Sequence, residues 1–311
     1  MSVTPLATAM PPAPTLAQPA PASAVLEVRG LDKSFRQRQV LRSLDWSVPG
    51  GRVIGLLGRN GAGKTTLLRC LLGLSPIDGG NITLFGQPML EPGGERMHRI
   101  GFVPQTFDLF PWMKVRAYLD FTAAFYTRWN HELVTRLLAN WELDAKQKIG
   151  ELSQGQRQKL AIVRAIAPDP DLLVLDEPVA SLDPQARRAF MGELLTLMRA
   201  PGKTVIFSTH ITADLERAGA DIALLRDGRI QFTRPLAELR ERLKRVVLTR
   251  AEGWAQAPTA AGSLKSSVQG EQAVLLVEDP VIESLHALAA RENASMHIET
   301  PTLEDLFVEL A

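Results

Sequence analysis

The chain has 311 residues, 45% of them hydrophobic and 22% charged, with a formal net charge of +1. This length exceeds one ordinary domain, so we expect a domain of roughly 200 residues with a smaller one attached. The near-neutral charge excludes a general electrostatic attraction to nucleic acid. The single cysteine excludes an intramolecular disulfide, and no apolar run is long enough to span a membrane.

The first predicted feature along the chain is a disordered leader, residues 1–24, which is dominated by proline and alanine. No lysine or arginine precedes Arg29, so the basic start of a secretory signal is missing. From residue 25, short apolar runs alternate with stretches of helical leucine spacing, which predicts a mainly parallel α/β sheet. The predicted strands are residues 25–28, 53–58, 81–85, 100–104, 172–175, 204–208, 222–226 and 229–232.

The helical pattern is most extended at about residues 106–150, which we interpret as a helical subdomain of the main domain. A charged helical stretch at residues 237–245 then leads away from the sheet. The segments that follow are predicted as strands at 246–249 and 273–277 and as helices at 281–290 and 303–310. We therefore predict a main domain over residues 25–236 and a small α+β accessory domain over residues 237–311.

A phosphate-binding loop is predicted at Gly58-Arg-Asn-Gly-Ala-Gly-Lys64-Thr65, which matches G-x-x-x-x-G-K-[ST]. The loop follows an apolar strand and opens a helix, so backbone N–H groups and the helix N-terminus would surround the phosphates. Lys64 would place its charge on the β- and γ-phosphates, and Thr65 its hydroxyl on Mg²⁺. The residues of this loop predicted to bind ATP are Gly58, Asn60, Gly61, Ala62, Gly63, Lys64, Thr65 and Thr66.

Two carboxylates, Asp176 and Glu177, directly follow the apolar strand at residues 172–175. Such a strand would deliver Asp176 beside the phosphate-binding loop, where it can hold Mg²⁺ through water. Glu177 would then polarise the water that attacks the γ-phosphate. The loop and the two carboxylates together predict an enzyme that binds ATP and Mg²⁺ and hydrolyses ATP.

The segment Leu152-Ser-Gln-Gly-Gln156 precedes these carboxylates, and with it the sequence resembles the ABC ATPase family over its predicted main domain. The family signature is Leu-Ser-Gly-Gly-Gln, so Gln154 replaces the first glycine and the other four positions match. The resemblance implies that Ser153, Gly155 and Gln156 bind ATP, with the first two at the γ-phosphate. It also implies a P-loop NTPase core with an antiparallel β flank.

Further positions match the family one by one. Gln105 is similar to the Q-loop glutamine, which implies a place at Mg²⁺ and the attacking water. Asp183 lies in a segment similar to the D-loop between two ATP sites, and His210 resembles the switch histidine at the γ-phosphate. Phe35 stands where the family stacks an aromatic ring on adenine, and Val40 would line the same face. The predicted catalytic residues are thus Glu177, His210 and Gln105, and the predicted metal-site residues are Thr65, Gln105 and Asp176.

The resemblance also implies partners and a location. Two copies, or one copy and a homologous ATPase subunit, would face head to tail, so that each ATP lies between one P-loop and the signature of the other chain. The pair would work as peripheral subunits on the cytoplasmic face of the bacterial inner membrane, beneath an integral membrane permease. ATP would close the pair and hydrolysis would release it, and no nucleic acid is expected as a partner.

The segment Thr300-Pro-Thr-Leu-Glu-Asp-Leu-Phe307 resembles the end of bacterial ABC-2 type exporter subunits, which makes an exporter our leading hypothesis. One alternative is a soluble ABC ATPase that acts in a ribosome- or DNA-associated process. A single P-loop, and a spacing of 89 positions from Lys64 to Ser153, argue against it. An importer ATPase is the other alternative, and the sequence leaves the transported substrate open.

Residues 106–113 follow Gln105 and are unusually apolar for a loop after a strand, with Phe107, Phe110 and Trp112 among them. A loop beside the ATP site can change its position when ATP binds and so transmit that change. We predict that part of this segment forms a groove for a short cytoplasmic helix of the membrane partner.

Overall fold

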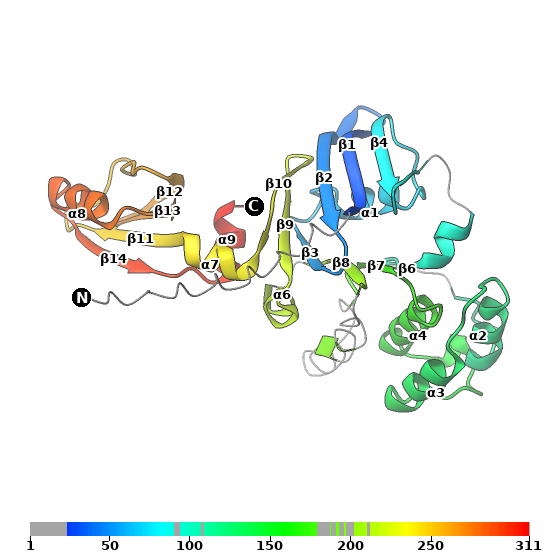
Figure 1. Cartoon of the computed structure of the whole chain (residues 1–311). Helices are drawn as coiled ribbons and strands as arrows, with labels where there is room; N and C mark the ends of the chain where they lie inside the picture. Colours follow the sequence, from blue (N-terminus) through cyan, green and yellow to red (C-terminus); the bar gives the residue numbers. More distant parts are fainter. Residues whose placement is uncertain are drawn as a thin grey trace, which may run out of the picture.

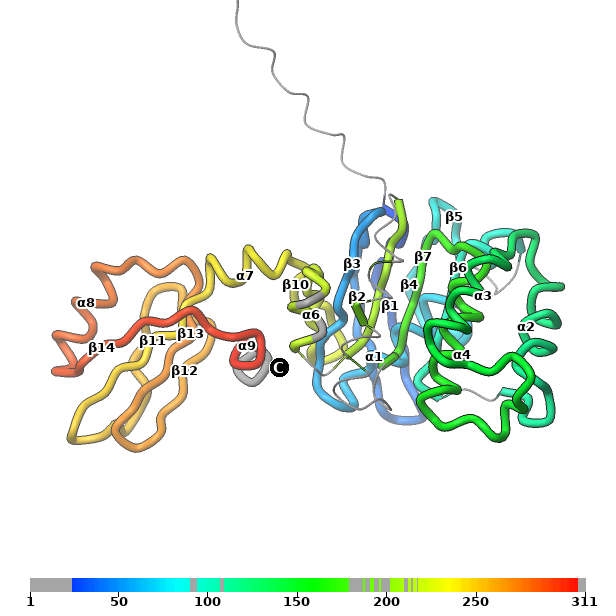
Figure 2. The backbone as a smooth tube through the Cα atoms, turned by 90° about the horizontal axis from the view of Figure 1, so that it is seen from below, coloured from blue at the N-terminus to red at the C-terminus, as the bar shows by residue number. Residues whose placement is uncertain are grey.

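The computed structural model describes residues 24–89, 94–106, 109–178, 202–209 and 212–310, together with positions 187, 191, 192 and 196. In Figure 1 these residues form a main part, residues 24–235, and a C-terminal part, residues 236–310, which lie side by side. Seen from below in Figure 2, a group of helices occupies one end of the molecule and the C-terminal sheet the other. Within the described residues the strands form three sheets, two in the main part and one in the C-terminal part.

The main sheet has six strands in the order β10-β9-β3-β8-β7-β6. Five of them run parallel, and β10 is antiparallel to its neighbour β9. Parallel strands of this kind are covered on both faces, which explains why β7 is apolar at every position but its last. The strands are β3 (Val53–Leu57), β6 (Ile100–Val103), β7 (Leu172–Asp176), β8 (Thr204–Ser208), β9 (Asp221–Arg226) and β10 (Arg229–Pro235).

A second sheet, in the order β2-β1-β4-β5, is the antiparallel flank that the family resemblance implied. Helix α1 (Lys64–Leu71) packs against both sheets, because Leu67, Leu68 and Leu71 share one hydrophobic core with strands of each. The indole N–H of Trp46 donates a 3.0 Å hydrogen bond to the Thr233 hydroxyl and so joins β2 to β10. The strands of the flank are β1 (Ala24–Phe35), β2 (Arg38–Pro49), β4 (Gly79–Leu84) and β5 (Gln87–Pro88).

Helices gather beyond the β6 edge of the main sheet, as both views show (Figures 1 and 2). They are α2 (Val115–Ala123), α3 (His131–Asn140) and α4 (Gln154–Ile166), with 3₁₀ turns at Glu95–Arg99 and Ile149–Glu151. Each of α2 and α3 buries one face, because its apolar residues recur at intervals of three and four. Helix α4 packs against β6 and thereby joins these helices to the main sheet.

The C-terminal part is a four-stranded antiparallel sheet in the order β12-β13-β11-β14, with α8 packed on one face. The helix predicted to reach residue 245 ends at Arg242, because Val246 and Leu248 are buried as the inward residues of a strand. Strand β12 has a polar sequence that gave no strand signal, and it exists through its backbone pairing with β13. The elements are α7 (Leu236–Arg242), β11 (Leu243–Thr249), β12 (Ser263–Gln269), β13 (Gln272–Glu278), α8 (Ile282–Arg291), β14 (Ser295–Glu299) and α9 (Leu303–Leu310).

Helix α9 folds back onto the main part and contacts α6 (Thr212–Ala218). Its residues Leu303 and Leu306 belong to the same hydrophobic core as Leu215 of α6. An ion pair of 2.7 Å between Arg240 and Glu216 also joins α7 to α6. The two parts are therefore packed together through apolar contacts as well as connected by the chain. In the part of the chain that the structure describes, no helix has the length and apolar character needed to cross a membrane.

Candidate functional site

The predicted phosphate-binding loop lines a cavity of about 370 Å³ at one edge of the main sheet. The loop connects the end of β3 to the start of α1, so its position follows from the parallel sheet and the helix after it. The lining residues are Arg38, Val40, Asn60, Gly61, Gly63, Lys64, Thr65, Thr66, Gln105 and Glu177. Residues predicted from three separate motifs thus meet around one cavity.

Two glycines of the loop are needed for its close fit against neighbouring strands. Gly63 has φ 103°, and a Cβ there would lie 2.8 Å from Cγ1 of Val40 in β2. A Cβ at Gly58 would lie 2.6 Å from the carbonyl oxygen of Leu225 in β9. Only glycine fits both places without displacing a strand. The same contact brings Val40, which was predicted to line the adenine face, against the loop.

Lys64 is buried, with 6% of its surface exposed, at the first position of α1. Its Nζ donates hydrogen bonds to the carbonyl oxygens of Gly58 at 2.7 Å and Arg59 at 3.3 Å, so the ammonium lies inside the loop. Burial lowers the pKa of Lys64, while the negative charges of Glu177 and Asp176 act in the opposite direction. A phosphate bound in the loop would favour the charged form in the same way as these carboxylates.

Asp176 and Glu177 stand at the carboxyl end of β7, on the same edge of the sheet as the loop. Asp176 is 1% exposed, and its Oδ1 accepts a 2.6 Å hydrogen bond from the Ser208 hydroxyl. The backbone N–H of Glu177 donates to the same hydroxyl oxygen at 3.0 Å. Ser208, which sequence reasoning missed, therefore positions both acidic residues. The available signal was a hydroxyl at the carboxyl end of β8, a strand whose three central residues are apolar.

Glu177 has a backbone φ of 48°, in a region that residues other than glycine seldom adopt. Its Oε2 lies 3.4 Å from Nε2 of Gln105, and both side chains line the cavity. Strained backbone of this kind is concentrated at functional sites, where the surrounding structure maintains it. The geometry brings the predicted general base and the predicted Q-loop glutamine together.

The cavity has the donors that Mg²⁺ prefers, which are oxygen atoms of carboxylate and hydroxyl groups. Thr65 lines the cavity and Asp176 ends the strand beside it. Among the described residues, no group of three or more His, Cys, Asp or Glu could hold a metal ion alone. Mg²⁺ commonly binds one or two protein groups together with substrate phosphates, and Thr65 and Asp176 are the residues that would hold it here.

The signature residues do not line this cavity, although the same chain carries both. Ser153 caps the N-terminus of α4: its hydroxyl accepts from the Gln156 N–H at 3.2 Å, and Gln156 Oε1 accepts from the Ser153 N–H at 2.9 Å. Gly155 lies in the first turn of the same helix, which contains no acidic residue. Helix α4 therefore begins with the positive end of its dipole outside the P-loop cavity of the same chain.

Other predicted site residues have different outcomes. Phe35 ends β1 with 51% of its surface exposed, and it does not line the cavity. Gly58 and Ala62 belong to the loop but are likewise not among the lining residues. Asp183 and His210 lie outside the described residues.

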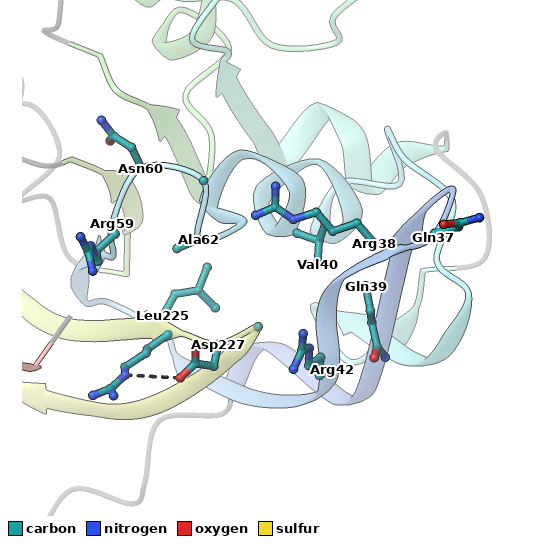
Figure 3. A pocket seen from close by; sticks show the side chains of 13 residues that line it. Gln37, Arg38, Gln39, Val40, Arg42, Arg59, Asn60, Ala62, Leu225 and Asp227 are labelled. Atoms are coloured by element: carbon teal, nitrogen blue, oxygen red, sulfur yellow. Dashed lines mark ion pairs between the residues drawn. The ribbon is translucent and has the colours of Figure 1, made fainter.

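A second cavity of about 840 Å³ adjoins the loop and shares Val40, Asn60 and Gly61 with the first. Figure 3 shows Arg38 extending from β2 toward the loop, while Arg42 and Arg59 lie at other edges of the cavity. Arg38 lines both cavities, which makes it the candidate cation for an anion bound in the loop. Sequence reasoning missed this residue, and the available signal was a cation between the two residues predicted to contact the nucleoside.

Comparisons with known proteins agree with this geometry. The model of the ABC transporter family matches residues 41–180. The chain is 35% identical over 300 residues to Nod factor export ATP-binding protein I of Burkholderia lata, covering 92% of this chain and 97% of that protein. The protein of the same name from Rhizobium sp. (strain N33) is 34% identical over 297 residues, covering 92% and 96%.

Solved structures resemble the main part. An ATP-binding subunit of an ABC transporter has a TM-score of 0.62 and 28% identity, covering 70% of this chain and 92% of that one. A dimeric ATP-binding cassette in a post-hydrolysis state with ADP and Pi has a TM-score of 0.60 and 25% identity, covering 68% and 98%. The fold predicted from the sequence, a P-loop core with an antiparallel flank, is confirmed.

Proposed function

The chain belongs to the ABC transporter family, and on this basis we propose that it is the ATP-hydrolysing subunit of a membrane exporter. It binds ATP and hydrolyses it, as the ATP-binding subunits of that family do. The observation that carries the proposal is the meeting of Lys64, Thr65, Gln105 and Glu177 around one cavity. Export is supported by relatives named as export ATP-binding proteins, which match almost the whole length of this chain.

The residues divide the reaction between them in this proposal. Lys64 and the backbone of the loop bind the β- and γ-phosphates, and Thr65 and Asp176 hold Mg²⁺, which neutralises phosphate charge when bound. Glu177 accepts a proton from the attacking water, and Gln105, 3.4 Å from it, orients that water. Ser208 holds Asp176 and Glu177 in place through the two hydrogen bonds described above.

We also propose that two copies complete each other's sites in a head-to-tail pair. Dimeric cassettes among the similar structures support an assembly of two such chains. Ser153 and Gly155 lie at a positive helix end away from their own P-loop cavity, so they are available to the γ-phosphate bound by another copy. ATP then joins the two chains, and hydrolysis removes the γ-phosphate that both chains bind.

The experiment that tests the shared site uses Glu177→Gln. The amide cannot accept the proton from water, so turnover should fall by about 10²- to 10⁴-fold while ATP still binds. Unhydrolysed ATP should then hold two copies together, and light scattering after gel filtration should show a dimer only when ATP is added. The double variant with Lys64→Ala is the matched control and should stay monomeric. A Glu177→Gln protein that binds ATP and remains monomeric at high concentration contradicts the shared site.

A surface for the membrane partner is proposed on the aromatic groove, a cavity of about 430 Å³ between α2, α4 and β6. Phe110, Phe121 and Phe125 line it with partly exposed rings, and their centroids lie 5.1–6.0 Å apart in sequence order. Trp112 does not line the cavity but stacks on Phe110 at 5.3 Å and is 71% exposed. Phe107 lies outside the described residues.

The position of the aromatic groove supports its role in coupling. Phe102 of β6 lines it, and Gln105 of the ATP cavity follows three residues later. A short apolar helix bound to the exposed rings would therefore contact β6, whose carboxyl end leads directly to Gln105 in the P-loop cavity. We propose that such a helix belongs to an integral membrane permease, which places this chain at the cytoplasmic face of the membrane as a peripheral subunit.

A further inference from the structure

The exposed ring of Phe35 has a buried ammonium group beneath it. Lys33 Nζ lies 5.1 Å from the centroid of the Phe35 ring, within reach of a cation–π interaction. Lys33 is only 6% exposed, whereas Phe35 is 51% exposed. The lysine therefore covers the inner side of the ring, and the outer side is left open to solvent.

Asp78 fixes this lysine and the backbone beside it. Its Oδ1 lies 3.3 Å from Lys33 Nζ, and its Oδ2 accepts a 2.5 Å hydrogen bond from the Ser34 N–H. The Asp78 N–H in turn donates to the Asp32 carbonyl oxygen at 2.9 Å. The hydrogen bond from the Ser34 N–H is the main cause that lowers the pKa of Asp78, so it favours the charged carboxylate. One residue thus fastens three consecutive positions of β1 directly before Phe35.

Asp78 also connects the end of β1 to the helix that follows the phosphate-binding loop. The segment between α1 and Asp78 is tied to that helix by hydrogen bonds from the N–H groups of Leu74 and Ser75 to the Arg69 carbonyl oxygen, at 2.9 and 3.3 Å. Asp78 therefore links the backbone before Phe35, through this segment, to the C-terminal end of the helix that begins at Lys64. A ring fixed relative to this helix would suit a ligand that has phosphates at one end and a flat base at the other.

A buried lysine without a catalytic contact needs an explanation, because removing an ammonium group from water costs free energy. An apolar side chain could fill the same space without that cost. The cation under the ring gives this position a property that an apolar side chain lacks, which is attraction for one face of an aromatic ring. Without the cation, an exposed ring at the end of a hairpin would lose rotational freedom when a base stacks on it, and this loss would weaken binding.

We propose that Lys33, held by Asp78, is a positioning residue that fixes the Phe35 ring as the platform for the purine base of the nucleotide. The proposal rests on the ATP site proposed above and adds residues that the family motifs do not name. The cation holds the inner face of the ring, and the base stacks on the outer face. Base recognition and phosphate recognition are then separable, because Lys33 acts on the first and Lys64 on the second.

The test compares Mg-ADP with Mg-pyrophosphate on the full-length protein, since neither is hydrolysed by this site and only ADP has a base. Phe35→Ala should weaken ADP binding by about tenfold, since a base stacked on an aromatic ring contributes that much or more. Lys33→Met, which keeps the length of the side chain and removes its charge, should weaken ADP binding by about threefold to fivefold. Asp78→Asn should act in the same direction, and pyrophosphate affinity should not change in any of the three. Asp279→Asn is the matched control, an exposed carboxylate paired with Arg242 in the C-terminal part, and it should alter neither affinity.

The possible results separate this inference from the proposed function. If Phe35→Ala weakens ADP binding and neither Lys33→Met nor Asp78→Asn does, the positioning role is overturned and the ATP site stands. If Phe35→Ala leaves ADP binding unchanged, the purine base does not stack on the Phe35 ring and the inference is overturned. If Lys33→Met weakens both ligands equally, its effect is general to the site and the inference is also overturned. Lys64→Ala, which should weaken both ligands, tests the proposed ATP site by itself.

Discussion

The main part and the C-terminal part of this chain treat polar side chains differently. Among the described residues, the buried polar or charged side chains all belong to the main part: Lys33, Lys64, Gln158, Asp176, Thr204, Ser208 and Thr209. The C-terminal part keeps its charges at the surface, in pairs such as Arg242 with Asp279 at 2.6 Å and Arg245 with Glu299. Burying a charge costs free energy unless it is paired and hydrogen-bonded. In the main part, Lys64 and Asp176 bear this free-energy cost at the P-loop cavity and at the strand end beside it, whereas the C-terminal part buries no charged side chain among its described residues.

The two parts also differ in what their helices do. In the main part α1 and α4 begin at the residues proposed to bind phosphate, Lys64 and Ser153. In the C-terminal part α9 contributes apolar packing, with Leu303 and Leu306 in the core that contains Leu215. The comparison predicts that variants of the main part change ligand affinity, whereas variants of the C-terminal part change stability.

The largest effect is expected for Lys64→Ala. Removing a buried charge that pairs with phosphates should cost about 2–5 kcal/mol of ATP binding free energy, which isothermal titration calorimetry can measure. Lys203→Ala is the control, because Lys203 pairs with Asp169 at 2.9 Å at the start of β8, the opposite end of the strand from the site. Unchanged ATP affinity in Lys64→Ala would contradict the idea that the buried charge of the main part serves ligand binding.

Leu306→Ala is the corresponding variant of the C-terminal part. Truncating a buried leucine should lower the free energy of unfolding by about 2–5 kcal/mol in a denaturant titration, with ADP affinity unchanged in the folded protein. The exposed Leu264 of β12 provides the control, since Leu264→Ala should have little effect. A folded Leu306→Ala protein that loses ADP affinity would show that the C-terminal part contributes to the site.

The same packing bears on the predicted boundary at residue 236, which stays a prediction. A chain that ends there retains the described residues of the P-loop cavity and loses the α9 contacts on α6. We expect it to bind and hydrolyse ATP but to unfold at a lower temperature than the full chain. A well-folded but inactive truncated protein would mean that the C-terminal part completes the ATPase.

Trp112→Ala tests the apolar surface of the main part beside the aromatic groove, in contrast to the polar nucleotide site. If this exposed aromatic residue is an anchor, its loss should weaken association with the proposed membrane partner by about 2 kcal/mol, which co-purification can measure. The ATPase rate of the free subunit should remain within experimental error. Val281→Ala, a similar exposed apolar residue of the C-terminal part, should co-purify normally. Normal co-purification and transport by Trp112→Ala would exclude this residue from the partner surface.

The smallest effect is expected for Arg38→Ala, because an exposed cation is screened by solvent. We expect ATP affinity to fall by about 1 kcal/mol, or roughly fivefold. Arg42→Ala is a matched control, since Arg42 lines the larger cavity and not the P-loop cavity. Equal effects of the two substitutions would mean that general charge, and not a contact in the site, governs affinity.

Much of the main part could be predicted from its sequence. Strands such as β7 are continuous apolar runs because both of their faces are covered, and glycines mark the loop because backbone must pass close to other strands there. The strands of the C-terminal part were harder to predict from the sequence, and β12 was not predicted. Its residues are mostly exposed, so no alternation of apolar and polar residues identifies the strand, and pairing with β13 alone determines it.

The sequence by itself determined which chemistry this protein has, because the spacing of glycines, Lys64 and the carboxylates at a strand end is local along the chain. It also determined the six strands of the main sheet in their order along the chain, whereas β2 and β12 of the other two sheets were not predicted. Only the tertiary structure decided which groups meet: Ser208 under Asp176, Val40 against Gly63, and Asp78 beneath the end of β1. These contacts join residues from 23 to 45 positions apart. No local pattern encodes such a distance, because it depends on how the sheets and helices pack together.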